Sequence, residues 1–138
     1  MAAPTTFRSF VDALEATSVS GVSRSFTQGP PEGAPGVADC PFQYVRFPEG
    51  NEIPLVFGEQ GGDPTLRAEF VVCVEPTGQS TAPENFDDTV DMMDAVTTGL
   101  RALSCITKSH LSWSIRLGID IVAGQAYFAV IAAVEGRG

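Results

Sequence analysis

The sequence is poor in the residues on which many enzyme and metal sites depend. It has one histidine, His110, and three cysteines, Cys40, Cys73 and Cys105, which lie far apart and form no CxxC pair. Zinc sites take several such ligands at close spacing, so the pattern argues against one. A cysteine nucleophile needs a neighbouring base, and only His110 could serve. We therefore expect buried free thiols, an uncatalytic histidine and no metal site.

Long apolar runs and nucleotide-binding motifs are also missing. No run reaches the roughly 18 residues of a membrane helix, and the N-terminus lacks a basic region followed by an apolar one. The sequence contains no GxGxxG, GxxxxGK[ST], GxSxG or HExxH pattern. These absences favour a protein that is not an enzyme, binds no cofactor and no membrane, and is made in a cytoplasm.

Positive charge is scarce. The net charge is −9, and the eight basic residues comprise one lysine and seven scattered arginines. Such scattering forms no stripe that could follow a phosphate backbone. We expect no specific binding to nucleic acid, although an acidic surface would repel DNA and so suit a protein past which DNA slides.

The chain does contain enough apolar material for one folded domain. It has 138 residues, of which 43% are hydrophobic and 18% charged, which fits a single domain with a modest core. Its first half predicts a helix over about 6–16, a weak strand within 18–28, a Pro/Gly-rich loop over 29–41 and an aromatic strand over 40–47. Residues 66–75 are apolar on both faces, which is typical of a central strand.

The second half predicts a long helix and a hairpin. An apolar stripe indicates a helix over about 85–103, formed by Phe86, Val90, Met93, Val96, Leu100 and Leu103. Alternation from residue 111 and a turn at 122–125 predict a C-terminal hairpin over about 111–135. Without regular βαβ alternation, the fold class is α+β, an antiparallel or mixed sheet packed by one long and one short helix. We expect one core, comprising Phe70, Val72, Phe86, Val90, Met93, Leu100, Trp113, Ile115 and Phe128.

An acidic stretch, FDDTVDMMD, begins this helix. It includes DDTVD, a match to the DDxxD pattern with which prenyl-transferring enzymes hold magnesium diphosphate. Such a site needs a second charged cluster across a cavity, which this chain lacks. Asp87, Asp91 and Asp94 lie at i, i+4 and i+7, away from the apolar stripe, and carboxylates favour a helix N-terminus. We interpret them as a solvated or partner-facing acidic surface.

The segment PEGNEIPLVFGEQGGDP, residues 48–64, has chain breakers at both ends and an apolar centre. Loops of this length are uncommon and often functional. Ile53, Leu55, Val56 and Phe57 are costly to leave in water, while the flanking glycines loosen both ends. Two interpretations stay open: a flap folded onto its own core, or an arm that contacts a neighbouring molecule.

Residues 66–136 place LRAEFVVCVEP, NFDDTVDMMDAVTTGLRAL and AYFAVIAAVEG in the order strand, acidic helix and last strand of a hairpin. This order, with the helix of residues 6–16, resembles the small tail terminator (tail completion) proteins of long-tailed bacteriophages and related neck and tail-tube components. The resemblance is one of architecture. The loop over 29–41 and the arm over 48–64 match nothing in it residue by residue.

The resemblance implies a structural protein of the virion, located in the tail and neck and assembled in the host cytoplasm. It implies a homo-hexameric ring that caps the tail tube, contacts the tail tube protein and joins it to a head-side connector or stopper protein. DNA would pass by without specific binding, and the arm of Ile53 to Phe57 would contact a neighbouring subunit or the tube. The alternatives are another neck or tail component, such as a head–tail stopper or tube protein, and a small cytoplasmic enzyme or ligand-binding α+β domain with an enclosed pocket.

Overall fold

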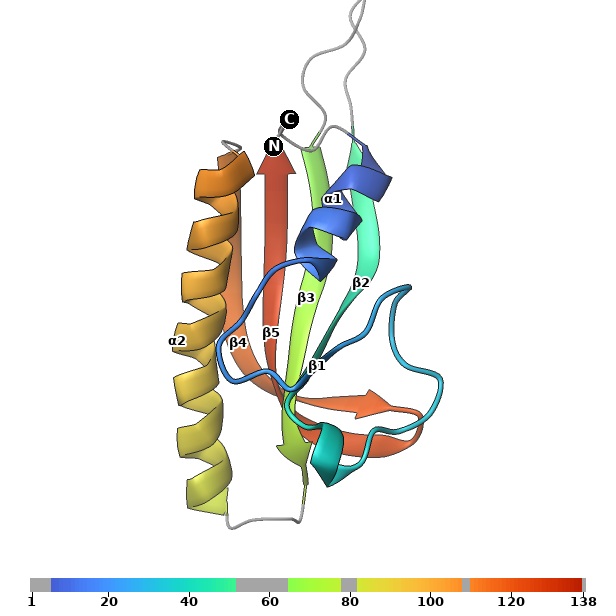
Figure 1. The fold of residues 1–138 in the computed structure, drawn as a ribbon, viewed down its shortest axis with the longest axis vertical. Helices are drawn as coiled ribbons and strands as arrows, with labels where there is room; N and C mark the ends of the chain where they lie inside the picture. The colour runs from blue at the N-terminus through green and yellow to red at the C-terminus, as the bar shows by residue number, and fades with distance from the viewer. Residues whose placement is uncertain (1–5, 52–64, 78–81, 108–109, 138) are drawn as a thin grey trace, which may run out of the picture.

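A computed structural model describes residues 6–51, 65–77, 82–107 and 110–137, which form one α+β domain (Figure 1). Helices α1 (Phe7–Glu15) and α2 (Ala82–Thr107) lie against one face of a five-stranded sheet. The strands are β1 (Arg24–Ser25), β2 (Phe42–Asn51), β3 (Thr65–Pro76), β4 (His110–Val122) and β5 (Gln125–Arg137), in the spatial order β1-β2-β3-β5-β4. Only β1 and β2 are parallel. The predicted fold class is confirmed.

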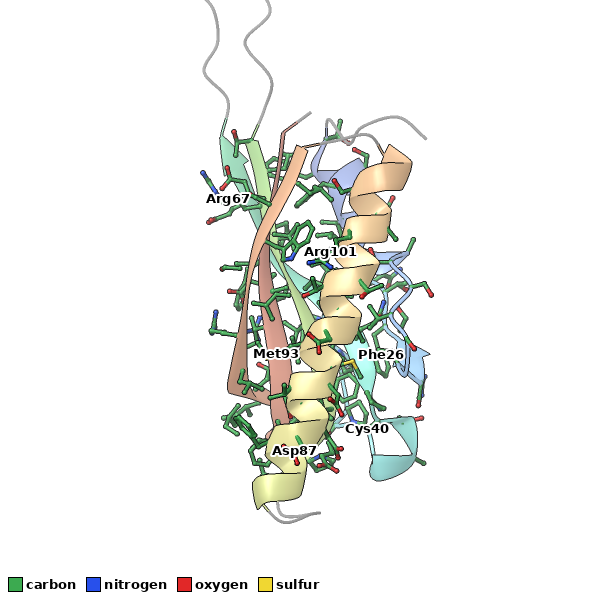
Figure 2. The ribbon with its side chains drawn as sticks, turned by 90° about the vertical axis from the view of Figure 1, so that its left-hand side faces the viewer. Phe26, Cys40, Arg67, Asp87, Met93 and Arg101 are labelled. Atoms are coloured by element: carbon green, nitrogen blue, oxygen red, sulfur yellow. The ribbon has the colours of Figure 1, made fainter. Side chains whose placement is uncertain are left out.

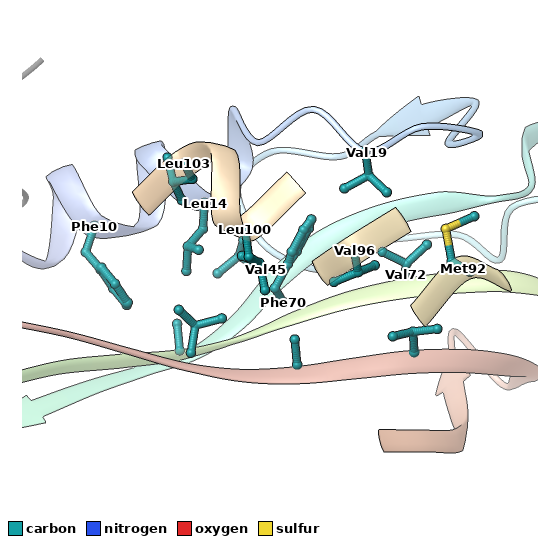
Figure 3. Packing of buried hydrophobic residues seen from close by; sticks show 14 of the residues in the cluster. Phe10, Leu14, Val19, Val45, Phe70, Val72, Met92, Val96, Leu100 and Leu103 are labelled. Atoms are coloured by element: carbon teal, nitrogen blue, oxygen red, sulfur yellow. The ribbon is translucent and has the colours of Figure 1, made fainter. Parts of the chain in front are cut away.

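The core lies between the helices and the two central strands (Figure 3). Alternate side chains of β3 and β5, such as Phe70 and Val130, are fully buried against it. The helices contribute Phe10, Leu14, Met92, Val96, Leu100 and Leu103. Burial of a side chain of this size contributes about 1.5–3 kcal/mol before entropy is counted. Because β3 is also buried on its other face, its prediction as a central strand is confirmed.

The buried stripe of α2 follows the prediction only in the second half of the helix. Phe86 is 58% exposed and Val90 is half-buried, whereas Thr89 and Met92 are buried. Placing Phe86 in the core was therefore wrong. The reason is that α2 also packs against the segment of residues 17–22. The side of the helix that faces this segment, with Met92, is therefore buried, and the side with Phe86 is not. A Cβ added at Gly99 would lie 2.9 Å from the Ser18 carbonyl oxygen, so only glycine permits this close approach.

β2, β3, α2 and the two strands of the hairpin are longer than the sequence indicates, whereas α1 is slightly shorter than the predicted 6–16 and β1 keeps only two residues of the weak strand expected within 18–28. Thr6 and Ser9 form a capping box that starts α1. β2 continues to Asn51, so residues 48–51 of the predicted arm belong to a strand. A bulge between Arg46 and Glu49 explains the difference, because an edge strand accommodates proline at a bulge. The rest of the arm, with Ile53, Leu55, Val56 and Phe57, lies outside the described residues.

The Pro/Gly-rich loop has a structural role that its composition did not indicate. It contains a short 3-10 helix, η1 (Val37–Asp39), and covers the lower half of the sheet face opposite the helices. The Tyr127 hydroxyl donates a hydrogen bond to the Pro35 carbonyl oxygen at 2.6 Å. The Phe42 ring meets Phe26 and Tyr127 edge-on, at 5.6 and 5.2 Å between ring centroids. Tyr127, rather than the predicted Phe128, is therefore the buried aromatic residue of β5.

The hairpin of β4 and β5 is confirmed. Its two turn residues, Ala123 and Gly124, have φ values of 49° and 86°, the left-handed conformation that closes a two-residue hairpin. The ladder is regular from the pair Val122 and Gln125 to the pair His110 and Arg137. Trp113 and Ile115 pack against the helix-side core as predicted, but they are only half-buried.

These burial differences predict the effects of substitution in the two halves of α2. We expect Leu100→Ala to lower the free energy of unfolding by about 2–5 kcal/mol, because it leaves a cavity in the core. Phe86→Ala should cost less than about 1 kcal/mol, as is usual for surface positions. Urea denaturation of the dilute chain measures both. Equal losses for the two variants would contradict this assignment of the core.

Candidate functional site

The sheet face opposite the helices, here called the open face, carries rows of polar side chains at its upper end. The strand register places Ser112, Glu135, Arg67 and Glu49 in one row, and Ser114, Ala133, Glu69 and Arg46 in the next. All of these residues except Arg46 border a shallow hollow of about 550 Å³, together with Phe47 of β2. Small side chains on β4 and β5 keep one half of the hollow flat.

The charges in this hollow are largely matched within the sheet. Arg46 Nε lies 2.8 Å from Glu69 Oε1, and Arg67 Nε lies 3.3 Å from Glu135 Oε2. Each pair joins residues directly opposite one another on neighbouring strands, where opposite charges stabilise a sheet. Arginines that are already paired with carboxylates have little remaining attraction for an anionic ligand.

Asp120 is the centre of a buried polar group on the same face. Its carboxylate accepts hydrogen bonds from the Tyr44 hydroxyl, from Arg46 Nη1 at 2.5 Å and from the Cys73 thiol at 3.6 Å. Asp120 belongs to β4, at the opposite edge of the sheet from β2. It reaches β2 because the lower part of the hairpin curls over the open face (Figure 1). The contact therefore joins the two outer sides of the sheet.

The ionisation of this group explains what it does. Burial raises the pKa of the Tyr44 hydroxyl and of the Cys73 thiol, and Asp120 raises both further. Burial lowers the pKa of Arg46, but the hydrogen bonds to Glu69 and Asp120 outweigh this effect and raise it overall. The group therefore holds a neutral phenol, a neutral thiol and a cation between two carboxylates. A protonated thiol is a poor nucleophile, so Cys73 fits a structural role better than a catalytic one.

The acidic residues that the sequence singles out are exposed. Asp87, Asp91 and Asp94 lie on the surface of α2, with Asp87 near its lower end (Figure 2). Asp91 also borders a cleft that it shares with Met92 and Cys40. Among the described residues no three potential ligands gather at a metal site. None of the helices in these ranges is long and apolar enough to cross a membrane.

The sheet ends in two different free edges, a feature that the sequence patterns did not reveal. Within the described ranges, no strand pairs with the outer side of β4 along any of its 13 residues. At the other edge, β1 pairs only with Phe42 and Gln43, so no strand in the described part of the chain pairs with the outer side of β2 from Tyr44 onward. Alternation in β4 predicted a strand with one apolar face but carried no information about its neighbours.

Comparison with known proteins assigns no family. No protein-family model matches the chain, and no curated protein sequence matches it. The function therefore has to be inferred from the free edges, the hollow and the chemistry of the side chains around them.

Because Asp120 is buried and Glu135 is not, we predict that the loss of Asp120 destabilises the fold much more than the loss of Glu135. We expect Asp120→Ala to lower the free energy of unfolding by about 3 kcal/mol, because it leaves Tyr44 and Arg46 buried without their shared acceptor. Glu135→Ala breaks an exposed pair and should cost less than about 1 kcal/mol. Chemical denaturation of both variants checks this. Similar losses would show that Asp120 does not fix the hairpin.

The exposed aspartates predict indifference to divalent cations. Titration with magnesium or manganese should leave the thermal midpoint nearly unchanged, because within the described ranges no second acidic cluster completes a coordination shell. The double variant Asp87→Asn with Asp91→Asn serves as the control and should respond in the same way. A saturable stabilisation that is lost in this variant would identify the acidic surface as a metal site after all.

Proposed function

We propose that this chain is a structural assembly protein of a phage tail, a tail terminator that forms a homomeric ring on the tail tube and joins it to the head-side neck. The observation that carries the proposal is the pair of unlike free edges on one sheet. Two different complementary surfaces on one subunit produce head-to-tail association, which closes into a ring when the rotation between subunits is right. A hexamer is the ring size that the resemblance implies.

The chemistry of the described residues supports a structural role. The buried polar group uses its charges internally, and its cysteine is held as a thiol. The remaining ion pairs of the open face join neighbouring strands. The one thiol that lies beside a carboxylate in this group, Cys73 next to Asp120, is buried and kept protonated, and the hollow nearby is shallow. This arrangement favours assembly over catalysis.

The order of the elements also supports the proposal. Strand β3 leads into the acidic helix α2 and then into the β4–β5 hairpin, the order on which the resemblance to tail terminators rests. The net charge of −9 suits a protein past which DNA moves, because an acidic wall does not retain a polyanion. The tail tube protein and a head-side connector or stopper protein would be its partners in the virion.

A ligand-binding domain is the second candidate, and the hollow of about 550 Å³ on the open face favours it. Small-molecule sites are usually concave, enclosed and mostly apolar. This hollow is shallow, and the two arginines that border or adjoin it are already paired with Glu135 and Glu69. Assembly is therefore the better supported function.

The ring proposal predicts that the protein is oligomeric in solution and that the arm is needed for assembly. The purified chain should form oligomers, alone or with the tail tube protein, as measured by light scattering after gel filtration. Deletion of residues 52–58 should leave a folded monomer that neither assembles nor caps tubes, because the apolar residues Ile53, Leu55, Val56 and Phe57 are removed.

A control for this deletion replaces the neighbouring polar residues Glu59 and Gln60 by serine, which should leave assembly intact. If the deletion unfolds the isolated chain, the arm is part of its own core. If the full chain also stays monomeric with the tube protein present, the ring proposal is wrong.

A further inference from the structure

The pairing of β4 with β5 determines which backbone groups of β4 face outward. The two-residue turn of the hairpin pairs the backbone groups of the residues that flank it, Val122 and Gln125. The Ala126 carbonyl oxygen points the other way, because it accepts a hydrogen bond from the Thr77 N–H at 3.0 Å. The ladder continues without irregularity to His110, and the direction of the backbone groups alternates along it. Even-numbered residues of β4 therefore pair with β5, and odd-numbered residues present their N–H and C=O groups at the free edge.

In the upper part of β4, the outward backbone groups belong to an apolar row. Leu111, Trp113 and Ile115 pack against the helix-side core, but they are only half-buried, whereas Val130 of β5 is fully buried. This row is distinct from the lower end of β4, where Asp120 contacts β2. Residues that lie opposite one another on neighbouring strands share a face of the sheet. A strand added at this edge would therefore place the side chains of its hydrogen-bonded residues beside this row.

Residues 52–57 of the arm, with the sequence EIPLVF, have the pattern that such a strand needs. Proline has no N–H, so within a sheet it occupies positions whose backbone faces away from the neighbouring strand. If Pro54 faces away, the backbone groups of Ile53, Leu55 and Phe57 face the neighbouring strand, because the direction alternates. The side chains of these three residues then lie on one face. The position of the proline thus selects large apolar residues for pairing.

One antiparallel register matches the two apolar rows and also a pair of charges. The apolar residues meet in the pairs Ile53–Ile115, Leu55–Trp113 and Phe57–Leu111. In the same register Glu52 lies opposite Arg116, which is exposed and has no ion-pair partner within the described residues. Opposite charges on adjacent strands are favourable. A parallel arrangement of the same rows would place Gly58 near Arg116 instead, so the charges favour the antiparallel one.

In this register the added strand has to come from a second copy of the chain. β2 ends at Asn51, directly before Glu52, and lies on the opposite side of the sheet from β4. Three strand spacings, about 14 Å, separate β2 from β4. The ladders place Asn51 level with His110, so Arg116 also lies further down β4. One residue spans only about 3.8 Å, and Glu52 therefore cannot reach Arg116 of its own chain.

We propose that residues 52–57 of one copy bind as an additional antiparallel strand to the upper part of β4 in a second copy, with Glu52 paired to Arg116. The inference rests on the ring function proposed above and names the contact through which the arm assembles the ring. Main-chain hydrogen bonds of the added strand provide affinity, and the side-chain pairs determine its register. Because the binding and the bound surfaces differ, the contact is head-to-tail.

A disulfide between two variants tests the register. Val56 and Ser112 would form a pair without hydrogen bonds, in which the Cα atoms lie about 4.5 Å apart, close enough for a disulfide. A mixture of Val56→Cys and Ser112→Cys should therefore give a linked dimer on mild oxidation, and mass spectrometry of the linked peptides identifies the two new cysteines. Each chain carries only one of them, so the bond cannot form within a chain. Ser114→Cys, which is also exposed on β4 but diagonal to Val56, should link to Val56→Cys much less.

Charge reversal tests the ion pair independently. Glu52→Arg and Arg116→Glu should each weaken assembly by about two- to fivefold at low salt, and the two changes in one chain should restore it. Glu59→Arg, outside the paired stretch of the arm, should leave assembly unchanged. Light scattering measures assembly, and the emission of Trp113, the only tryptophan, should shift to shorter wavelength when Leu55 covers it. Circular dichroism with thermal melts verifies that each variant is folded.

The outcomes separate this contact from the ring function. If the wild-type chain assembles but the mixed cysteine variants form no linked dimer, or the double charge variant does not recover, the added strand is wrong and the ring function stays possible. A disulfide that forms only within a chain carrying both Val56→Cys and Ser112→Cys would show that the arm covers its own sheet, and would also overturn the contact. A wild-type chain that stays monomeric at high concentration and with tube protein would overturn both proposals.

Discussion

A single buried carboxylate joins the two outer sides of this sheet. Asp120 on β4 accepts hydrogen bonds from Tyr44 and Arg46 on β2, although β5 and β3 lie between these strands. The contact is possible only because the lower hairpin curls over the open face. The curl and the loop over 29–41 together bury the apolar lower half of that face. Among the described residues, nothing covers the upper half of that face, with its matched charges, and no strand pairs with the outer side of β4.

The helix side shows a related division of surface. The segment of residues 17–22 packs against α2 near Gly99 and draws the buried stripe of the helix toward Thr89 and Met92. The flank that carries Phe86 then remains uncovered beside β4. The packing that completes the core on one side of α2 therefore leaves apolar surface on the other.

Several polar groups of β2, β3 and β5 hold the fold together. Arg46 is shared between Glu69 and Asp120, and Arg67 is paired with Glu135. Gln43 is buried and donates to the Thr17 carbonyl oxygen at 2.9 Å, which ties the segment after α1 to β2. A fold that uses its charges internally and leaves two unlike edges free is suited to joining copies of itself.

The sequence by itself determined the α+β class, the central strand, the C-terminal hairpin and the buried half of α2 from Val96 onward, because periodicity is a local property of the chain. Only the tertiary structure decided that Thr89 and Met92, and not Phe86 and Val90, are the buried residues in the first half of α2. It also decided that Tyr127 is buried and that Asp120 contacts Tyr44. These features depend on residues distant in sequence, such as Ser18 against Gly99 and Pro35 against Tyr127. The free edges of the sheet could not be predicted either. The order of strands in a sheet depends on pairing between distant segments, and the periodicity of a single segment contains no information about that pairing.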